Sequence, residues 1–203
     1  MSKQTLYSKR SNLVLGFHGC DQSVVNKVLM GKETLNESNN DYDWLGHGVY
    51  FWENNKERAF EFAQANSKRR NSNIEKPAVF GAVIDLGYCM DLIDSEFLNE
   101  LKDAYDTLKT TFELIGETLP ENKGDSPDKL LRKLDCAVIE TAHAINKDAI
   151  QFDSVRGVFW EGDPIYPGAT FSKKNHIQIC IRNPNCIKGF FLPKEIVRNY
   201  TNP

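Results

Sequence analysis

Long apolar runs are missing from this sequence. The apolar stretch nearest the N-terminus, residues 13–17, is far shorter than the core of a signal peptide and is followed by polar sequence. No stretch approaches the roughly 20 consecutive apolar residues that a membrane-spanning helix needs. We therefore expect a cytoplasmic protein with no membrane partner.

Cysteine is present, but its number and spacing are typical of neither a disulfide framework nor a zinc site. The five cysteines are an odd number, and no two of them form a Cys-x-x-Cys pair. This pattern favours free thiols in a reducing compartment over a disulfide framework or a zinc site. No spacing of His, Cys, Asp and Glu indicates a metal ligand set, so we expect no metal.

Two common phosphate-binding motifs are also absent, because the sequence contains neither Gly-x-Gly-x-x-Gly nor a Walker-type loop. The net charge of −3 argues against a protein whose whole surface binds nucleic acid, although a local basic groove stays possible. The basic runs Lys68–Arg70 and Lys173–Lys174 are candidates for contacts with phosphate, but such runs are usually plain solvated surface. A length of 203 residues with 40% hydrophobic content predicts one globular domain, 1–203.

The hydrophobic pattern predicts strands at both ends of the chain and helices in the middle, which is an α+β class. Strands are expected at 12–17, 48–52, 78–86, 155–160, 177–181 and 187–192. A helix capped by Asp21 or Ser23 and ended by Gly31, and another over 56–65, lie between the first three strands. Two further helices, near 95–115 and from Ser126–Pro127 onward, form a helical insertion, 93–147, between the third and fourth strands.

Three places suggest a site for a flat ligand. His18 ends the first strand, and Gly19 after it has no Cβ and permits a close backbone approach. Two glycines flank His47 just before the strand that carries Tyr50, and Phe62 follows one helix later. Tyr50 and Phe62 can sandwich a planar heterocycle. Each of these residues alone is more simply explained as a core or structural residue. The hypothesis of a ligand site therefore depends on their combination.

That combination resembles a known family. The order is a strand ending in His-Gly, a helix, a polar loop, Gly-x-Gly-Val-Tyr-Phe, and a helix with Ala-x-x-Phe-Ala. It is similar to the ADP-ribosyltransferases of the diphtheria-toxin and poly(ADP-ribose) polymerase branch, as are Asp43–Gly46 and Gly81–Leu92. The resemblance implies a fold of two split sheets and NAD as co-substrate. By this resemblance His18 binds the adenosine ribose, Gly19 the nicotinamide amide, and Tyr50 and Phe62 the nicotinamide ring, with Gly48 in the same NAD-binding set.

One position departs from the family. A Glu opens the fifth strand there, binds the ribose 2′-OH and stabilises the oxocarbenium-like transition state, whereas this sequence has Gln178. An amide still accepts the 2′-OH hydrogen bond, but it carries no charge to offset the developing cation and is no general base. Chain elongation is therefore not expected. Glu161, at the mouth of the loop 161–176, is the candidate acid, although a Glu before Gly is usually just solvated.

The implied activity is mono-ADP-ribosylation of a macromolecular acceptor, protein or nucleic acid, with release of nicotinamide. In the family, the loop corresponding to 161–176 meets the target. Small members of this kind are often toxins of toxin–antitoxin or phage-defence systems, so an antitoxin or immunity partner is possible. Two alternatives stay open: a non-catalytic NAD- or ADP-ribose-binding module, and an RNA 2′-phosphotransferase, whose basic phosphate-binding residues are not evident.

Overall fold

The computed structural model describes residues 13–124 and 129–199, and within them the chain has the predicted α+β class. The helices are α1 (Gln22–Leu29), α2 (Lys56–Ser67), α3 (Ser95–Ile115) and α4 (Lys133–Ile145). The main sheet is mixed and has the order β4-β7-β8-β2-β1-β3-β9. Its strands are β1 (Leu13–Asp21), β2 (Val49–Glu53), β3 (Pro77–Asp85), β4 (Cys89–Asp91), β7 (Ser154–Phe159), β8 (His176–Ile181) and β9 (Ile187–Phe191). A small second sheet pairs β5 (Asn122–Lys123) with β6 (Leu131–Arg132).

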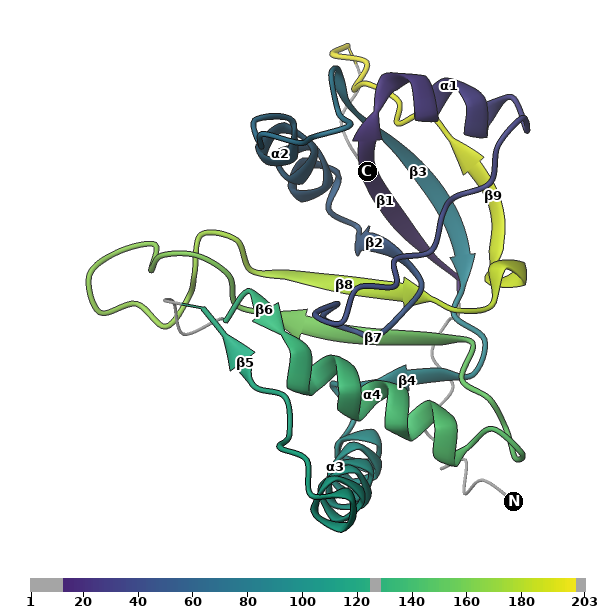
Figure 1. The fold of residues 1–203 in the computed structure, drawn as a ribbon. Coiled ribbons are helices and arrows are strands. Elements are labelled where there is room, and N and C mark those ends of the chain that lie inside the picture. Colours follow the sequence, from purple (N-terminus) through teal and green to yellow (C-terminus); the bar gives the residue numbers. More distant parts are fainter. Residues whose placement is uncertain (1–12, 125–128, 200–203) are drawn as a thin grey trace.

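The junction between β1 and β2 is the narrowest part of the main sheet. These strands pair only at Gly16–Glu53 and Phe17–Trp52, whereas β1 pairs with β3 along its whole length. In Figure 1, β1, β3 and β9 run at a steep angle to β8, β7 and β4. The structure therefore has one hydrogen-bonded main sheet that changes direction at this short ladder, and not the two split sheets that the family resemblance implies.

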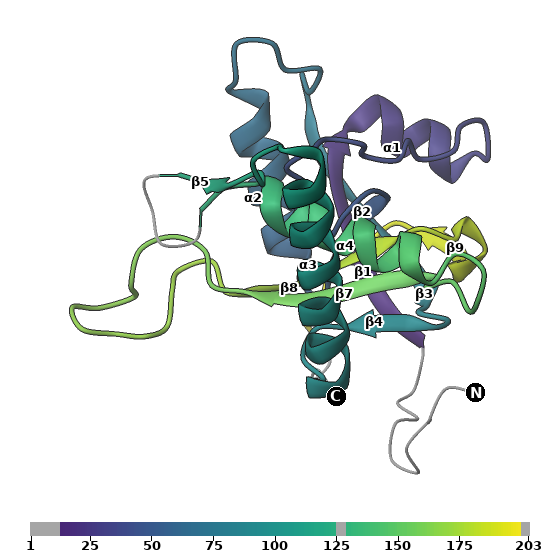
Figure 2. The same cartoon turned by 60° about the horizontal axis from the view of Figure 1, so that its bottom comes forward.

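Two hydrophobic cores lie on opposite faces of the sheet. The first packs α1 against β1 and β3, and the second packs α3 and α4 against β4, β7 and β8, as Figures 1 and 2 show. Strands β2 and β8 contribute to both cores, because successive side chains of a strand point to opposite faces. Phe51 and Ile179 enter the first core, whereas Tyr50 and Cys180 enter the second.

Most predicted elements are confirmed to within a few residues, but the start of the last helix is wrong. Ser126 and Pro127, the predicted cap, lie outside the described residues, and residues 129–132 are not helical. Helix α4 begins at Lys133, where the Asn122 side-chain oxygen accepts the main-chain N–H groups of Leu134 and Asp135 at 2.9 and 3.2 Å. The side chain that caps α4 thus comes from β5, and the sequence next to the helix start gives no sign of it.

The segment 93–147 is part of the fold's core and not an appendage. Its helices α3 and α4 supply Ala104, Leu108, Ile139 and Ala142 to the second core, and Tyr50 packs against this core. The five cysteines are free, as predicted. Among the described residues, no helix combines the length and the apolar character needed to cross a membrane.

Candidate functional site

His18 lies where β1 and β2 separate. Its Nδ1 is 2.8 Å from the carbonyl oxygen of Tyr50, and its ring packs against Phe51 and Phe80. Burial lowers the pKa of His18 below its usual value, although the hydrogen bond to Tyr50 opposes this. The imidazole is therefore neutral at neutral pH. Because Nδ1 faces a carbonyl oxygen it carries the proton, which leaves Nε2 as an acceptor.

Tyr50 has a fixed ring. Its hydroxyl accepts the Leu45 N–H at 2.8 Å and donates to the Gly46 carbonyl at 2.6 Å. Burial raises the pKa of Tyr50 well above its usual value, so the phenol stays protonated. The ring packs against the second core, whereas His18 packs against the first. The structure therefore brings His18 and Tyr50 together through the main chain of Tyr50, and not ring to ring.

The predicted close approaches at Gly19 and Gly48 are made by the protein itself. A Cβ on Gly19 would lie 1.9 Å from the carbonyl oxygen of Ala59, so α2 packs directly on β1 there. Gly48 has a φ of +151°, and its Cβ would lie 2.5 Å from the carbonyl oxygen of Ile181. Packing within the protein is therefore enough to explain why both positions are glycine. A contact between their main chain and NAD stays a prediction.

Phe62 and Gln178 are each neighbours of Trp52. The Phe62 ring packs on Trp52, with 4.9 Å between ring centroids, and 38% of Phe62 is exposed. Trp52 is directly opposite Gln178 in the β2–β8 pairing, and Tyr50 is two residues earlier on β2. Tyr50, Trp52 and Gln178 therefore share one face of the sheet, with Tyr50 and Trp52 about 7 Å apart along the strand.

Glu161 lies at the same end of the sheet and is held by two cations. Its carboxylate accepts hydrogen bonds from Arg58 of α2 at 2.8 Å and from Lys174 at 3.2 Å. Arg58 is 7% exposed and also binds Glu61. The negative charge of Glu161 is therefore largely offset by its partners. The contact also ties the loop after β7 to helix α2.

Three residues that the sequence did not single out lie beside this group. Trp52, Arg58 and His176 are each at most 7% exposed, and each keeps one buried nitrogen, Nε1, Nε and Nε2 respectively, without a hydrogen-bond partner. The Trp52 and His176 rings are 6.4 Å apart. Unpartnered buried nitrogens are rare and mark sites that need an explanation. His176, on the same face of β8 as Gln178, was detectable from its spacing.

A cavity of about 550 Å³ lies elsewhere, beyond the other end of β8 from Gln178. Glu140, His143, Lys147 and Arg182 are among the residues that line it, and none of the predicted NAD-binding residues does. Among residues 13–124 and 129–199, no group of three or more His, Cys, Asp or Glu side chains is arranged to hold a metal ion.

Comparison with known proteins finds sequence similarity to an uncharacterized protein. No family model matches it. It is similar to the uncharacterized protein MJ0359 of Methanocaldococcus jannaschii, with 26% identity over 193 residues. The alignment covers 85% of this chain and 83% of the relative. The similarity thus extends over most of both chains, and it assigns neither a family nor an activity.

Proposed function

We propose that this protein is an NAD-dependent mono-ADP-ribosyltransferase, which cleaves the N-glycosidic bond to nicotinamide and transfers ADP-ribose to a macromolecular acceptor. One observation carries the proposal. The β1–β2 ladder stops at Phe17–Trp52, and the residues that follow on β1, His18 and Gly19, face the part of β2 that carries Tyr50. The His18 ring and the Tyr50 main chain are therefore in contact at the point where the sheet opens, and the two side chains lie against different cores.

NAD would bind across this opening. The Nε2 of neutral His18 is an acceptor suited to a ribose hydroxyl, and the fixed ring of Tyr50 offers a planar face to nicotinamide. Phe62, held beside Trp52 and partly exposed, is the second aromatic of the pair. The short β1–β2 ladder and the change of strand direction there support the proposal, although all seven strands belong to one hydrogen-bonded sheet.

The chemistry requires stabilisation of a developing oxocarbenium-like cation. Gln178 lies on the Tyr50 face of the sheet, where its amide oxygen can accept a hydrogen bond from the ribose 2′-OH. We propose that Glu161 supplies the carboxylate that Gln178 lacks. Arg58 and Lys174 hold this carboxylate at the start of the loop 161–176. That loop forms a turn that exposes Tyr166 and Phe171, at 57% and 59%, and we propose that it meets the acceptor.

A second function is favoured by the ion pairs of Glu161. Because Arg58 and Lys174 offset its charge, and because Gln178 is neutral, both candidate groups offer less charge to a cation than a free carboxylate would. This favours a module that binds NAD or ADP-ribose without turnover. In either case the role of a toxin with an antitoxin or immunity partner is a proposal that rests on the family resemblance.

Nicotinamide release distinguishes the transferase from the non-catalytic binding module. The purified protein would be incubated with NAD alone and with fractions of a cell lysate, with release measured by chromatography and transfer by intact mass. An enzyme releases nicotinamide and adds ADP-ribose to a component of a fraction. Binding of NAD by calorimetry, without release in any fraction, would replace the enzyme with the binding module. Absence of both would refute both proposals.

A further inference from the structure

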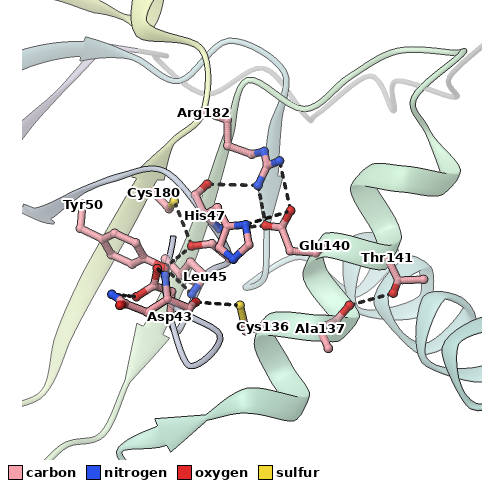
Figure 3. Close-up of polar contacts among 12 residues, drawn as sticks. Asp43, Leu45, His47, Tyr50, Cys136, Ala137, Glu140, Thr141, Cys180 and Arg182 are labelled. Atoms are coloured by element: carbon pink, nitrogen blue, oxygen red, sulfur yellow. Dashed lines mark hydrogen bonds and ion pairs between the residues drawn. The ribbon is translucent and has the colours of Figure 1, made fainter. Parts of the chain in front are cut away.

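The four residues Leu45–Gly48 are held from two sides. On one side the Tyr50 hydroxyl bonds to the main chain of Leu45 and Gly46. On the other side Glu140 of α4 and Arg182, just after β8, bind the main chain of His47, as Figure 3 shows. The segment therefore connects helix α4 mechanically to the ring of Tyr50.

Both main-chain polar groups of His47 are satisfied by this pair of side chains. The His47 N–H donates to Glu140 Oε1 at 2.8 Å, and Arg182 Nη1 donates to the His47 carbonyl at 3.1 Å. Arg182 Nη1 also donates to Glu140 Oε1 at 2.6 Å. An acceptor at position 140 and a donor at position 182 are thus both needed, and the ion pair between them sets their orientation.

The segment packs closely against α4. Gly46 has a φ of +75°, and a Cβ there would lie 2.5 Å from Glu140 Oε1 and 2.8 Å from the Ile139 side chain. Burial disfavours the charge of Glu140, but the hydrogen bonds from Arg182 and His47 outweigh this and lower its pKa. Glu140 is therefore ionised at neutral pH, and the contacts persist.

We propose that Glu140 and Arg182 are positioning residues for NAD. They fix Leu45–Gly48, and this segment fixes the ring of Tyr50 in the orientation that receives nicotinamide. The inference rests on the proposed NAD site and gives α4 a role in that site beyond its packing. It predicts that NAD affinity depends on the hydrogen-bonding groups at positions 140 and 182, and not on the stability of the fold as such.

The test compares four variants by NAD calorimetry, thermal unfolding and hydrogen exchange of the segment 43–50. Glu140→Gln keeps an acceptor for His47 and should bind NAD within about threefold of wild type. Glu140→Leu lacks the acceptor and should bind NAD about 10- to 100-fold more weakly, a loss expected when a charged hydrogen-bonding group is removed. Its segment 43–50 should also exchange faster.

Two variants separate positioning from stability. Val28→Ala opens the first core on α1, which packs on β1, β3 and β9, and should lower the unfolding temperature while leaving NAD affinity unchanged. The exchanged pair Glu140→Arg with Arg182→Glu remakes an ion pair without the two bonds to His47, so stability should recover relative to Glu140→Leu while NAD affinity stays low.

The outcomes decide between this inference and the proposed function. NAD binding by Glu140→Leu that equals wild type, restored binding in the exchanged pair, or an equal loss in Val28→Ala would each overturn the inference alone. If the wild type binds no NAD, the proposed function fails and the inference fails with it.

Discussion

The Nδ1 atom of His18 lies 2.8 Å from the carbonyl oxygen of Tyr50 and so spans the point where β1 and β2 part. This contact fixes the tautomer of His18 and directs its second nitrogen away from the Tyr50 main chain. Because the contact uses main-chain oxygen, a change of the Tyr50 side chain leaves it in place. His18 and Tyr50 are therefore separable by mutation.

The first prediction follows from that contact. His18→Ala removes the acceptor proposed for the ribose and should weaken NAD binding by about 1–3 kcal/mol, the usual scale for an unmade buried hydrogen bond. Leu114→Ala, at an exposed residue near the C-terminal end of α3, is the control and should bind NAD normally. Calorimetry measures both. Equal affinity of His18→Ala and wild type would remove His18 from the NAD site.

The second prediction concerns the packing of α2 on β1. Gly19→Ala forces the helix away from the strand, because its Cβ would meet the Ala59 carbonyl oxygen at 1.9 Å. We expect a loss of about 1–3 kcal/mol or more in the free energy of unfolding, measured by urea denaturation. Gly189→Ala, where a Cβ meets nothing within 4 Å, should be nearly neutral. Similar values for the two variants would contradict the close contact.

The third prediction tests the amide on β8. Gln178→Ala should reduce transfer of label from NAD moderately, because it removes only an orienting hydrogen bond. Gln178→Glu should leave transfer intact or raise it, because a carboxylate offsets the developing cation better than an amide. Nicotinamide release and transfer are measured together. A Gln178→Glu variant that is less active than Gln178→Ala would exclude the assigned position of Gln178.

The fourth prediction concerns Glu161. Glu161→Gln should lower the rate of transfer by about 10²–10³-fold, the scale for one lost preorganised charge. Asp163→Asn, two residues further along the same loop and paired with Lys173, should have little effect. Since Glu161 also holds the buried Arg58, unfolding temperatures are measured in parallel. An active Glu161→Gln enzyme would leave Gln178 as the remaining candidate.

The fifth prediction concerns the loop 161–176. Alanine at Tyr166 and Phe171 should reduce transfer to the acceptor and leave hydrolysis of NAD intact, because both side chains are exposed and belong to neither hydrophobic core. Leu192→Ala, at an equally exposed apolar residue after β9, is the control. If transfer and hydrolysis fall in parallel, the loop is a structural part of the NAD site.

Acid should destabilise the fold through buried histidines. Burial lowers the pKa of His143 to about 4, against about 6.5 in an unfolded chain. The unfolded state therefore binds the proton more readily below pH 6.5, so this contribution to stability is present above pH 6.5 and is lost as the pH falls towards 4. Thermal unfolding from pH 7 to 4 should show a smaller decline in His143→Gln than in wild type.

Much of the fold was predictable because its strands are short apolar runs bounded by glycine or polar residues. The strand of three residues, β4, gave no such signal, and the cap of α4 comes from Asn122, eleven residues before the helix begins. In the candidate site, the nearness of His18 to Tyr50 follows from adjacent strands. The pairing of Arg58 with Glu161 does not, because it joins positions 103 residues apart and depends on tertiary structure alone.

The sharing of β2 and β8 between the two cores has a consequence for cooperativity. Phe51 and Ile179 face one core while Tyr50 and Cys180 face the other, so neither core can melt without exposing a strand that the other requires. The strands of the first core also come from both ends of the chain, since β9 pairs with β3. Heat should therefore unfold the molecule in a single transition, and no cut between β3 and β7 should yield a half that folds by itself.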